Sequence, residues 1–368
     1  MIIGVPKEIK IGENRVGLTD ASVRQLVLEG HTVYIEKDAG VGSHISNDSY
    51  EKAGAKILPS AKDVWAEAQM IVKVKEPLPE EYNLMHENLV LYTYLHLAPE
   101  PKLTKALCDR KVKAIAYETI QLEDGSLPLL TPMSEVAGRM ATQIGATYLQ
   151  KDRGGMGVLL GGVTGVERAQ VTVLGGGVVG INAAKMAVGL GANVTILDVN
   201  HKRLEYLDDV FQGRIQTLYS NAHNIEEAIS QSHLVVGAVL VTGHRAPRLV
   251  TKEMVSRMMP GSVIVDVAVD QGGCIETCKP TSHMQPTYEV DGVIHYAVPN
   301  MPGAVARTST YALNNATYKY CSMLARYGVE EAVKKDRALY LGLNVYNGYV
   351  AYEPVARDLG MEYRPFKI

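Results

Sequence analysis

The sequence predicts an α/β protein of two doubly wound lobes separated by a cleft, with a C-terminal helical segment that returns to the first lobe. Three observations predict this fold. The chain has 368 residues, which suits two domains better than one core. Strand-like and helix-like stretches alternate in two successive series, a pattern that builds parallel sheets covered by helices. Residues 305–368 carry helical patterns without a strand series of their own.

The first series occupies the first third of the chain. A helix is predicted over residues 20–30, with Asp20 as its N-cap and Gly30 as its stop. A second helix begins at Pro101. The strand-like stretches, rich in β-branched and aromatic residues, are IIGV, TVYIE, MIVKV, LVLYTYL and KAIAY.

The second series follows a long helix that is predicted to begin near Ser134. Its strand-like stretches are VTVL, NVTILD, RIQTLY, HLVVGAVL, SVIVDVAV and VIHYAV, and helices are expected from Val178 and from His201. Six strands make a complete dinucleotide-binding domain. We therefore expect one domain from residues 1–130 and 305–368, and a Rossmann-like domain from residues 131–304.

The composition excludes several classes of protein. The formal net charge is -3 and no basic block stands out, which argues against nucleic acid or an anionic membrane as a partner. The N-terminus is charged where a signal peptide needs an apolar core, and the longest apolar run is residues 234–241. The four cysteines are scattered, as in a cytoplasmic protein with reduced thiols, and no metal site is expected.

A nucleotide site is predicted at LGGGVVG, residues 174–180. Gly175, Gly177 and Gly180 fit the spacing GxGxxG, follow a predicted strand and open a predicted helix. The first glycine makes a tight turn, the second lets the backbone approach a pyrophosphate, and the third lets helix and strand pack closely. The N–H groups at the start of the helix then face the phosphates.

The choice of nucleotide depends on Asp198, which ends the next strand. A carboxylate there accepts hydrogen bonds from the adenosine ribose and repels the 2′-phosphate of NADP, so NAD is favoured. Lys202 and Arg203 lie close enough to weaken that preference. The alternatives are a glycine-rich turn with an exposed aspartate in an unrelated sheet protein, or a turn that binds S-adenosylmethionine.

The substrate needs cations to hold an acid group and a base to move protons. His96 falls at the end of a strand, on the same face as Tyr92 and Tyr94, and imidazole suits proton transfer near neutral pH. The alternative is a buried histidine bonded to a backbone carbonyl. Lys73 and Lys75 share one face of another strand, and the alternative for them is an edge strand protected by lysines.

Two further side chains are candidates. Arg15 lies in a polar loop after the first strand, where a guanidinium could clamp a carboxylate through two hydrogen bonds. The alternative is an ordinary exposed arginine. Asp270 lies where the strand SVIVDVAV runs out into glycines, whereas Asp266 is expected to be deeper and structural.

Taken together, the motifs resemble the bacterial alanine dehydrogenases over nearly the whole chain. The resemblance implies reversible oxidative deamination of L-alanine to pyruvate and ammonium with NAD, a substrate lobe formed by the N-terminal part and the C-terminal segment, and a homohexamer. The matching motifs are GVPKEIK, ENRVGL, VKVKEPLPEEY, YTYLHLA, LPLLTPMSEVAGRM, LGGGVVG, TILDVNHKRL, GAVLVTG, VIVDVAVDQGGC and NMPGAVARTST.

The resemblance also implies roles for individual residues. Arg15 and Lys75 are expected to bind the substrate carboxylate and carbonyl oxygen. His96 and Asp270 are expected to transfer protons, and which of the two dominates stays open. Including the three glycines of the turn, the expected cofactor-binding residues are Ser134, Gly175, Gly177, Val178, Val179, Gly180, Asp198, Arg203, Ser220, Val239, Leu240, Val267, Ala268, Val269, Asp270, Lys279, Val298, Pro299, Asn300 and Met301.

Three rival functions remain. The NAD-binding subunit of proton-translocating transhydrogenase resembles the chain across both lobes but works with a membrane partner, and the segments that carry His96 and Lys75 favour the dehydrogenase. Saccharopine dehydrogenases resemble the chain more distantly. A catalytically inactive module that senses redox state would bind NAD without turning over alanine.

Overall fold

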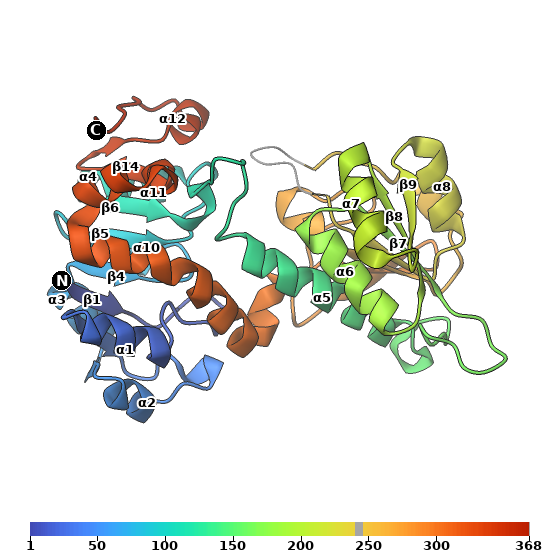
Figure 1. The fold of residues 1–368 in the computed structure, drawn as a ribbon, viewed down its shortest axis with the longest axis horizontal. Helices are drawn as coiled ribbons and strands as arrows, with labels where there is room; N and C mark the ends of the chain where they lie inside the picture. The colour runs from blue at the N-terminus through green and yellow to red at the C-terminus, as the bar shows by residue number, and fades with distance from the viewer. Residues whose placement is uncertain (240–245, 368) are drawn as a thin grey trace. The chain divides into compact units, whose positions relative to one another are not determined.

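Two sheets organise the chain, and each belongs to its own unit (Figure 1). Unit 1 comprises Met1–Met133 and Val305–Ile368, and unit 2 comprises Ser134–Ala304. The computed structural model describes residues 1–239 and 246–367, apart from the side chains of Asp270 and Gln271. We describe each unit by itself.

The sheet of unit 1 has the strand order β15-β14-β6-β5-β4-β1-β2-β3. Strands β1 to β6 are parallel, whereas β14 and β15 extend the sheet in antiparallel pairing. The chain order along the sheet reverses between β1 and β4, which makes this pair the topological switch point. The strands are β1 (Ile2–Val5), β2 (Thr32–Glu36), β3 (Lys56–Leu58), β4 (Met70–Val72), β5 (Val90–Thr93), β6 (Lys113–Ala116), β14 (Leu343–Tyr346) and β15 (Tyr349–Val350).

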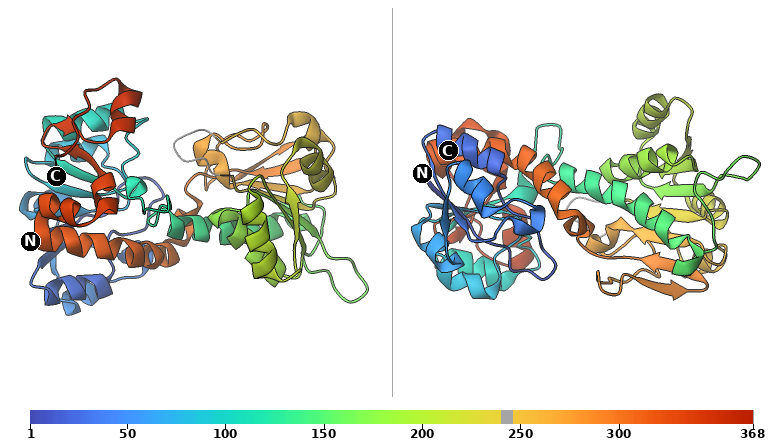
Figure 2. Two further views of the ribbon diagram at one scale, coloured as in Figure 1. Left: turned by 45° about the horizontal axis from the view of Figure 1, so that its top comes forward. Right: turned by 90° about the horizontal axis from the view of Figure 1, so that it is seen from below.

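Helices cover this sheet and bury its apolar residues. Trp65 of α3 and Leu103 and Leu107 of α4 belong to a fully buried cluster with residues of β4, β5 and β6. The long helix α10, which has a non-helical residue at Gly328, runs past α1 (Figures 1 and 2). The helices are α1 (Asp20–Leu28), α2 (Asn47–Lys52), α3 (Ala61–Glu67), α4 (Pro101–Asp109), α10 (Ala306–Lys335), α11 (Arg337–Gly342) and α12 (Glu353–Leu359), with 3₁₀ turns η1 (Val41–Ser43), η2 (Pro79–Leu84) and η3 (Tyr117–Thr119).

The sheet of unit 2 has the strand order β12-β13-β11-β10-β7-β8-β9. All its pairs are parallel except β12 with β13, and its switch point lies between β7 and β10. The strands are β7 (Gln170–Leu174), β8 (Asn193–Asp198), β9 (Gln216–Tyr219), β10 (Leu234–Gly237), β11 (Val263–Asp266), β12 (Thr287–Val290) and β13 (Val293–Tyr296).

The helices of unit 2 complete a Rossmann-like arrangement. Ile225 and Ile229 of α8 and Val255 of α9 are buried in a cluster with residues of β8, β10 and β11, whereas α6 packs on β7 and β8. The helices are α5 (Thr131–Tyr148), most of which belongs to this unit, α6 (Val178–Gly189), α7 (His201–Phe211), α8 (Ala222–Ser230) and α9 (Lys252–Ser256), with 3₁₀ turns η4 (Lys151–Arg153), η5 (Val267–Gln271) and η6 (Met301–Val305).

The predicted α/β class, with two parallel-rich sheets and a C-terminal segment that joins the first, is confirmed. Several details were wrong. The C-terminal segment contributes the strands β14 and β15, and the short strands β3 and β12 were not predicted. Helix α1 is capped by Thr19, whose side chain accepts the N–H of Ser22, and not by Asp20. Helix α5 begins at Thr131, before Ser134.

Candidate active site

The unit 1 side chains predicted to bind substrate or to transfer protons lie in the loops that follow the carboxyl ends of neighbouring strands. Arg15 follows β1, Lys75 follows β4 and His96 follows β5. Because these strands are adjacent and parallel, their ends meet at one edge, on both sides of the switch point. Open α/β sheets bind their ligands at such an edge. The charge of Arg15 acts on both Lys75 and Tyr94, and the rings of Tyr94 and His96 stack with centroids 5.9 Å apart.

Arg15 is buried, with 2% of its surface exposed, so the alternative of an exposed arginine is wrong. Its guanidinium donates two hydrogen bonds to the Glu13 carboxylate, from Nε at 2.7 Å and from Nη2 at 2.5 Å. Nη1 lies 3.1 Å from the sulfur of Met133. Burial acts to raise the pKa of Glu13, but the bonds from Arg15 lower that pKa to about 2. Glu13 is therefore ionised at neutral pH and fixes the plane of the guanidinium.

The backbone of Lys75 is fixed from both sides. Its N–H donates to the Glu8 carboxylate at 3.2 Å, and its carbonyl accepts the hydroxyl of Thr93 at 2.9 Å. Glu8 follows β1 and Thr93 ends β5, so both neighbouring strands position this residue. Burial and the nearby Arg15 charge lower the pKa of Lys75. Two neighbouring cations of this kind could hold an anionic group.

Lys73 has a structural environment, and the edge-strand alternative is wrong. Strand β4 lies between β1 and β5 and ends at Val72, so both lysines follow the strand. The ammonium of Lys73 is buried and lies 3.2 Å from Glu8 and 2.8 Å from Glu81. Its single positive charge is shared between these two buried carboxylates.

His96 is exposed, so the alternative of a buried, satisfied histidine is wrong. Strand β5 ends at Thr93, and the backbone turns at His96 with φ +48°, in the left-handed region. Its neighbours Leu95 and Leu97 are buried, which anchors the turn on either side. An accessible imidazole at this edge of the sheet can exchange protons with a bound substrate.

The predicted dinucleotide turn joins β7 to α6 in unit 2. Gly175 has φ +98°, which favours glycine. A Cβ added to Gly180 would lie 1.9 Å from the carbonyl oxygen of Gly175, so no side chain fits there. At Gly177, none of the described atoms lies within 4 Å of an added Cβ, and this open space adjoins the N-terminus of α6. The open space, together with the N–H groups of the helix N-terminus, fits the pyrophosphate of a dinucleotide.

Asp198 is tied to the glycine turn. Its carboxylate accepts the N–H of Gly176 at 2.7 Å and the N–H of Asn200 at 2.8 Å. Nε of Arg203 donates to the carbonyl of Gly176. An acceptor at the end of the second strand, held beside the turn, fits the position that a ribose diol needs.

The other expected cofactor residues mostly follow the carboxyl ends of unit 2 strands. They are Ser220 after β9, Val239 after β10, Val267, Ala268 and Val269 in η5 after β11, and Val298, Pro299, Asn300 and Met301 after β13. Leu240 and the side chain of Asp270 lie outside what the structure describes. Lys279 lies further along the chain, where its N–H donates to the Tyr288 hydroxyl at 2.8 Å.

Ser134 lies in the first turns of α5, which packs directly on α6. A Cβ added to Gly138 would lie 2.2 Å from the carbonyl of Val179, so the two helices touch near the start of α6. The hydroxyl of Thr142 donates to the carbonyl of Ala183 at 2.8 Å. Helix α5 therefore approaches the helix that carries the glycine turn.

Sequence reasoning missed the acidic partners of the predicted residues. Glu8 holds the backbone of Lys75, Glu13 pairs with Arg15, and Glu118 accepts the N–H of His96 at 2.7 Å. Glu8 and Glu118 each follow a predicted strand within a few residues, and this position was the available signal, whereas Glu13 lies two residues before Arg15 in the same loop. Asp266 is fully buried and accepts the N–H groups of Ala268, Cys274 and Ile275, as a structural residue would.

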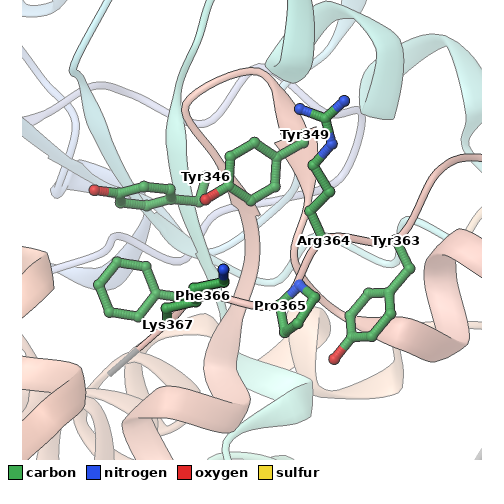
Figure 3. Close-up of a pocket in the computed structure, with 7 residues that line it drawn as sticks. All are labelled: Tyr346, Tyr349, Tyr363, Arg364, Pro365, Phe366 and Lys367. Atoms are coloured by element: carbon green, nitrogen blue, oxygen red, sulfur yellow. The ribbon is translucent and has the colours of Figure 1, made fainter.

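A surface pocket of about 510 Å³ lies elsewhere in unit 1 (Figure 3). It is lined by Tyr346, Tyr349, Tyr363, Arg364, Pro365, Phe366 and Lys367. The ring of Tyr346 lies 5.7 Å from Nζ of Lys113, the first residue of β6. This pocket is therefore at the amino ends of the parallel strands, opposite the edge that carries Arg15, Lys75 and His96.

The described residues contain no group of three or more His, Cys, Asp or Glu side chains able to hold a metal ion. Within the same part of the chain, no helix combines the length and the apolar character needed to cross a membrane.

Family models match successive parts of the chain. The model "Alanine dehydrogenase/PNT, N-terminal domain" matches residues 4–137, and "Alanine dehydrogenase/PNT, C-terminal domain" matches residues 141–353. The alanine dehydrogenase of Methanococcus maripaludis is 61% identical over 366 residues, which cover 99% of this chain and 98% of that protein. The alanine dehydrogenase of Bacillus subtilis strain 168 is 60% identical over 366 residues, covering 99% and 96%.

Solved structures are similar as well. An L-alanine dehydrogenase superposes with a TM-score of 0.96 at 56% identity, covering 98% of this chain and 99% of that one. A transhydrogenase from Sinorhizobium meliloti superposes with a TM-score of 0.83 at 27% identity, covering 96% of this chain and 99% of that one. The chain is thus similar to both groups over its whole length, and more so to the dehydrogenases.

Proposed function

The chain belongs to the alanine dehydrogenase/PNT family, and we propose that it catalyses the reversible NAD-dependent oxidative deamination of L-alanine to pyruvate and ammonium. One observation carries the proposal. Arg15, Lys75 and His96 stand at adjoining strand ends in a chain that is 61% identical to an alanine dehydrogenase over 366 residues.

The proposed division of labour assigns the substrate to residues 1–130 and 305–368, and NAD to residues 131–304. The charged edge of unit 1 supports the first assignment, because an amino acid is held through its carboxylate. The glycine turn and the start of α6 support the second, because a pyrophosphate needs close approach to backbone N–H groups.

Arg15 and Lys75 are proposed to hold and orient the substrate. The glycine turn of unit 2 would hold NAD, which would supply the hydride acceptor for the oxidation of alanine. The amine must be neutral beforehand, because a protonated nitrogen cannot supply the electron pair that forms the iminium. Arg15, fixed by Glu13, binds the carboxylate. The ammonium of Lys75 stabilises the negative charge that develops on the substrate oxygen during hydration.

Proton transfer is assigned to His96 and Asp270. Water adds to the iminium carbon, and one of these groups takes a proton from that water. The same group then assists collapse of the carbinolamine to pyruvate and ammonium. The exposed imidazole of His96 suits this task near neutral pH.

NAD is proposed as the cofactor in preference to NADP. Asp198 is held beside the glycine turn by the N–H groups of Gly176 and Asn200. A carboxylate there accepts the ribose hydroxyls and repels a 2′-phosphate. Arg203, bonded to the carbonyl of Gly176, reduces that repulsion.

We also propose that the protein is cytoplasmic and works as a homohexamer. The family resemblance supports the hexamer, and the net charge of -3 supports small molecules as partners in place of nucleic acid or membrane. Light scattering after size exclusion should give the mass of six chains, and a monomeric mass would overturn this part of the proposal.

The assay that tests the function follows reduced nicotinamide at 340 nm when purified protein meets L-alanine and NAD at mildly alkaline pH. D-alanine and NADP serve as parallel controls. We expect turnover with L-alanine and NAD and little with either control. If NAD bound without turnover, the redox-sensing or transhydrogenase-like alternative would replace the proposal.

A further inference from the structure

The turn that carries His96 is held by one carboxylate. Glu118 accepts the N–H of Leu95 at 3.2 Å on each of its oxygens, and it accepts the N–H of His96 at 2.7 Å. Glu118 lies in η3, directly after β6, and β6 pairs with β5. The carboxylate therefore links the ends of two adjacent strands through the backbone of the histidine.

This turn needs such support. The φ of His96 is +48°, in a region that residues with a Cβ seldom adopt. The flanking Leu95 and Leu97 are buried, while His96 itself is exposed. The turn thus presents one polar side chain from between two buried ones. Without an acceptor for its two N–H groups, the backbone would gain by relaxing toward an ordinary conformation.

The same hydrogen-bonding arrangement occurs at the neighbouring strand end. Glu8 accepts the N–H of Val74 at 2.6 Å and that of Lys75 at 3.2 Å. In both places a glutamate from the adjacent strand end binds the N–H of a functional residue and of the residue before it. Glu8 also pairs with the buried Lys73, so its removal would disturb the core. Among the described residues, the side-chain hydrogen bonds of Glu118 all go to the His96 turn.

We propose that Glu118 is a positioning residue that holds the left-handed turn at His96 and so presents the imidazole for proton transfer. The inference rests on the proposed role of His96. Glu118 acts through the backbone, because the N–H groups of both Leu95 and His96 donate to its carboxylate. Its loss lets the imidazole drift from the reacting water while the cations that bind the substrate stay in place.

The test is a double-mutant cycle with steady-state kinetics in both reaction directions. Glu118→Ala should lower kcat about 10- to 100-fold, because a displacement near 1 Å of a catalytic group costs that much, and KM for L-alanine should stay within about twofold of the parent, since substrate binding is untouched. Glu118→Gln keeps one acceptor oxygen and should recover part of the loss. In a His96→Ala background, Glu118→Ala should have no further effect.

Controls separate this inference from a general loss of structure. Emission from Trp65, the single tryptophan of the chain, reports the core of unit 1 and should be unchanged in each variant. The matched control is Glu123→Ala, which removes an exposed glutamate five positions further on.

The outcomes distinguish two failures. If Glu118→Ala stayed within twofold of the parent while His96→Ala was inactive, or if the two substitutions were additive, the role of Glu118 would be overturned and that of His96 kept. Full activity of His96→Ala would remove the proposed role of His96 and this inference with it.

Discussion

The six parallel strands of each sheet follow the same order, but the two sheets carry different chemistry at their carboxyl edges. In unit 1 the edge is made of charged side chains, among them Arg15, Lys75 and their glutamate partners. In unit 2 the edge is made mainly of glycine and backbone, with Gly175, Gly177 and Gly180 at its centre. The topology favours a ligand site beside the first strand in both units, and the residues after that strand would decide what such a site binds.

This difference predicts different sensitivities. A buried charge is stable where a partner of opposite sign and hydrogen bonds compensate its desolvation. Unit 1 should therefore respond to changes of charge and of pH. A phosphate site built from backbone N–H groups depends on the absence of side-chain atoms. NAD binding by unit 2 should therefore be sensitive to side-chain volume added at the glycine turn.

The largest effect is expected for Gly180→Ala. The new Cβ would lie 1.9 Å from the carbonyl oxygen of Gly175. This clash is with a backbone atom, so it cannot be relieved by a change of side-chain rotamer. NAD binding measured by calorimetry should be lost, while the Trp65 emission of unit 1 should be unchanged. Gly189→Ala is the matched control, since it lies at the other end of α6 and none of the described atoms is within 4 Å of its added Cβ. Retained NAD affinity in Gly180→Ala would contradict the proposal that the glycine turn binds the pyrophosphate.

The next largest effect is expected for Arg15→Lys, which should impair the substrate site of unit 1 and leave NAD binding by unit 2 unchanged. Lysine keeps the charge but cannot make the forked contact with Glu13. We expect kcat/KM for L-alanine to fall on the order of 100-fold, because the substrate is no longer held in the reactive orientation. NAD affinity should equal that of the parent. Arg24→Lys, an exposed position on α1, is the control, and equal losses in both variants would refute the role of Arg15.

Much of the fold could be predicted from local signals. β-branched runs such as NVTILD and LVLYT became β8 and β5, and the glycine spacing located the turn before α6. The missed strands are short or lie at sheet edges, where the apolar signal is weak. The hairpin of β14 and β15 did have a signal in Asn347 and Gly348, which both have positive φ in the turn.

The candidate site was less predictable, because its geometry depends on residues from different strands. The sequence marks Arg15 and Lys75 as basic residues near strand ends but does not reveal which acids they meet. Lys73 and Lys75 look alike in the sequence, yet one is neutralised in the core and the other lies beside Arg15. Such differences follow from strand order, which sets the neighbours of each strand end.

The smallest effect concerns acid stability. The pKa of Glu13 is lowered to about 2 in the folded protein from an ordinary value of 4.5. Its ionised form therefore stabilises unit 1 fully above pH 4.5, and this contribution is lost as the pH falls toward 2. Glu13→Gln lacks it, so the variant should be less stable than the parent by about 2 kcal/mol at pH 7. The difference should shrink below pH 4.5 and vanish only below pH 2.

Urea unfolding followed through Trp65, at several pH values, measures this difference for unit 1. Glu123→Gln, at an exposed position, controls for the loss of a carboxylate as such and should match the parent at every pH. A gap between Glu13→Gln and the parent that stayed constant from pH 7 to pH 3 would mean that packing, and not the ion pair with Arg15, sets the stability of this edge. The charged edge of unit 1 would then depend on packing, as the glycine turn of unit 2 does, more than the contacts of Arg15 suggest.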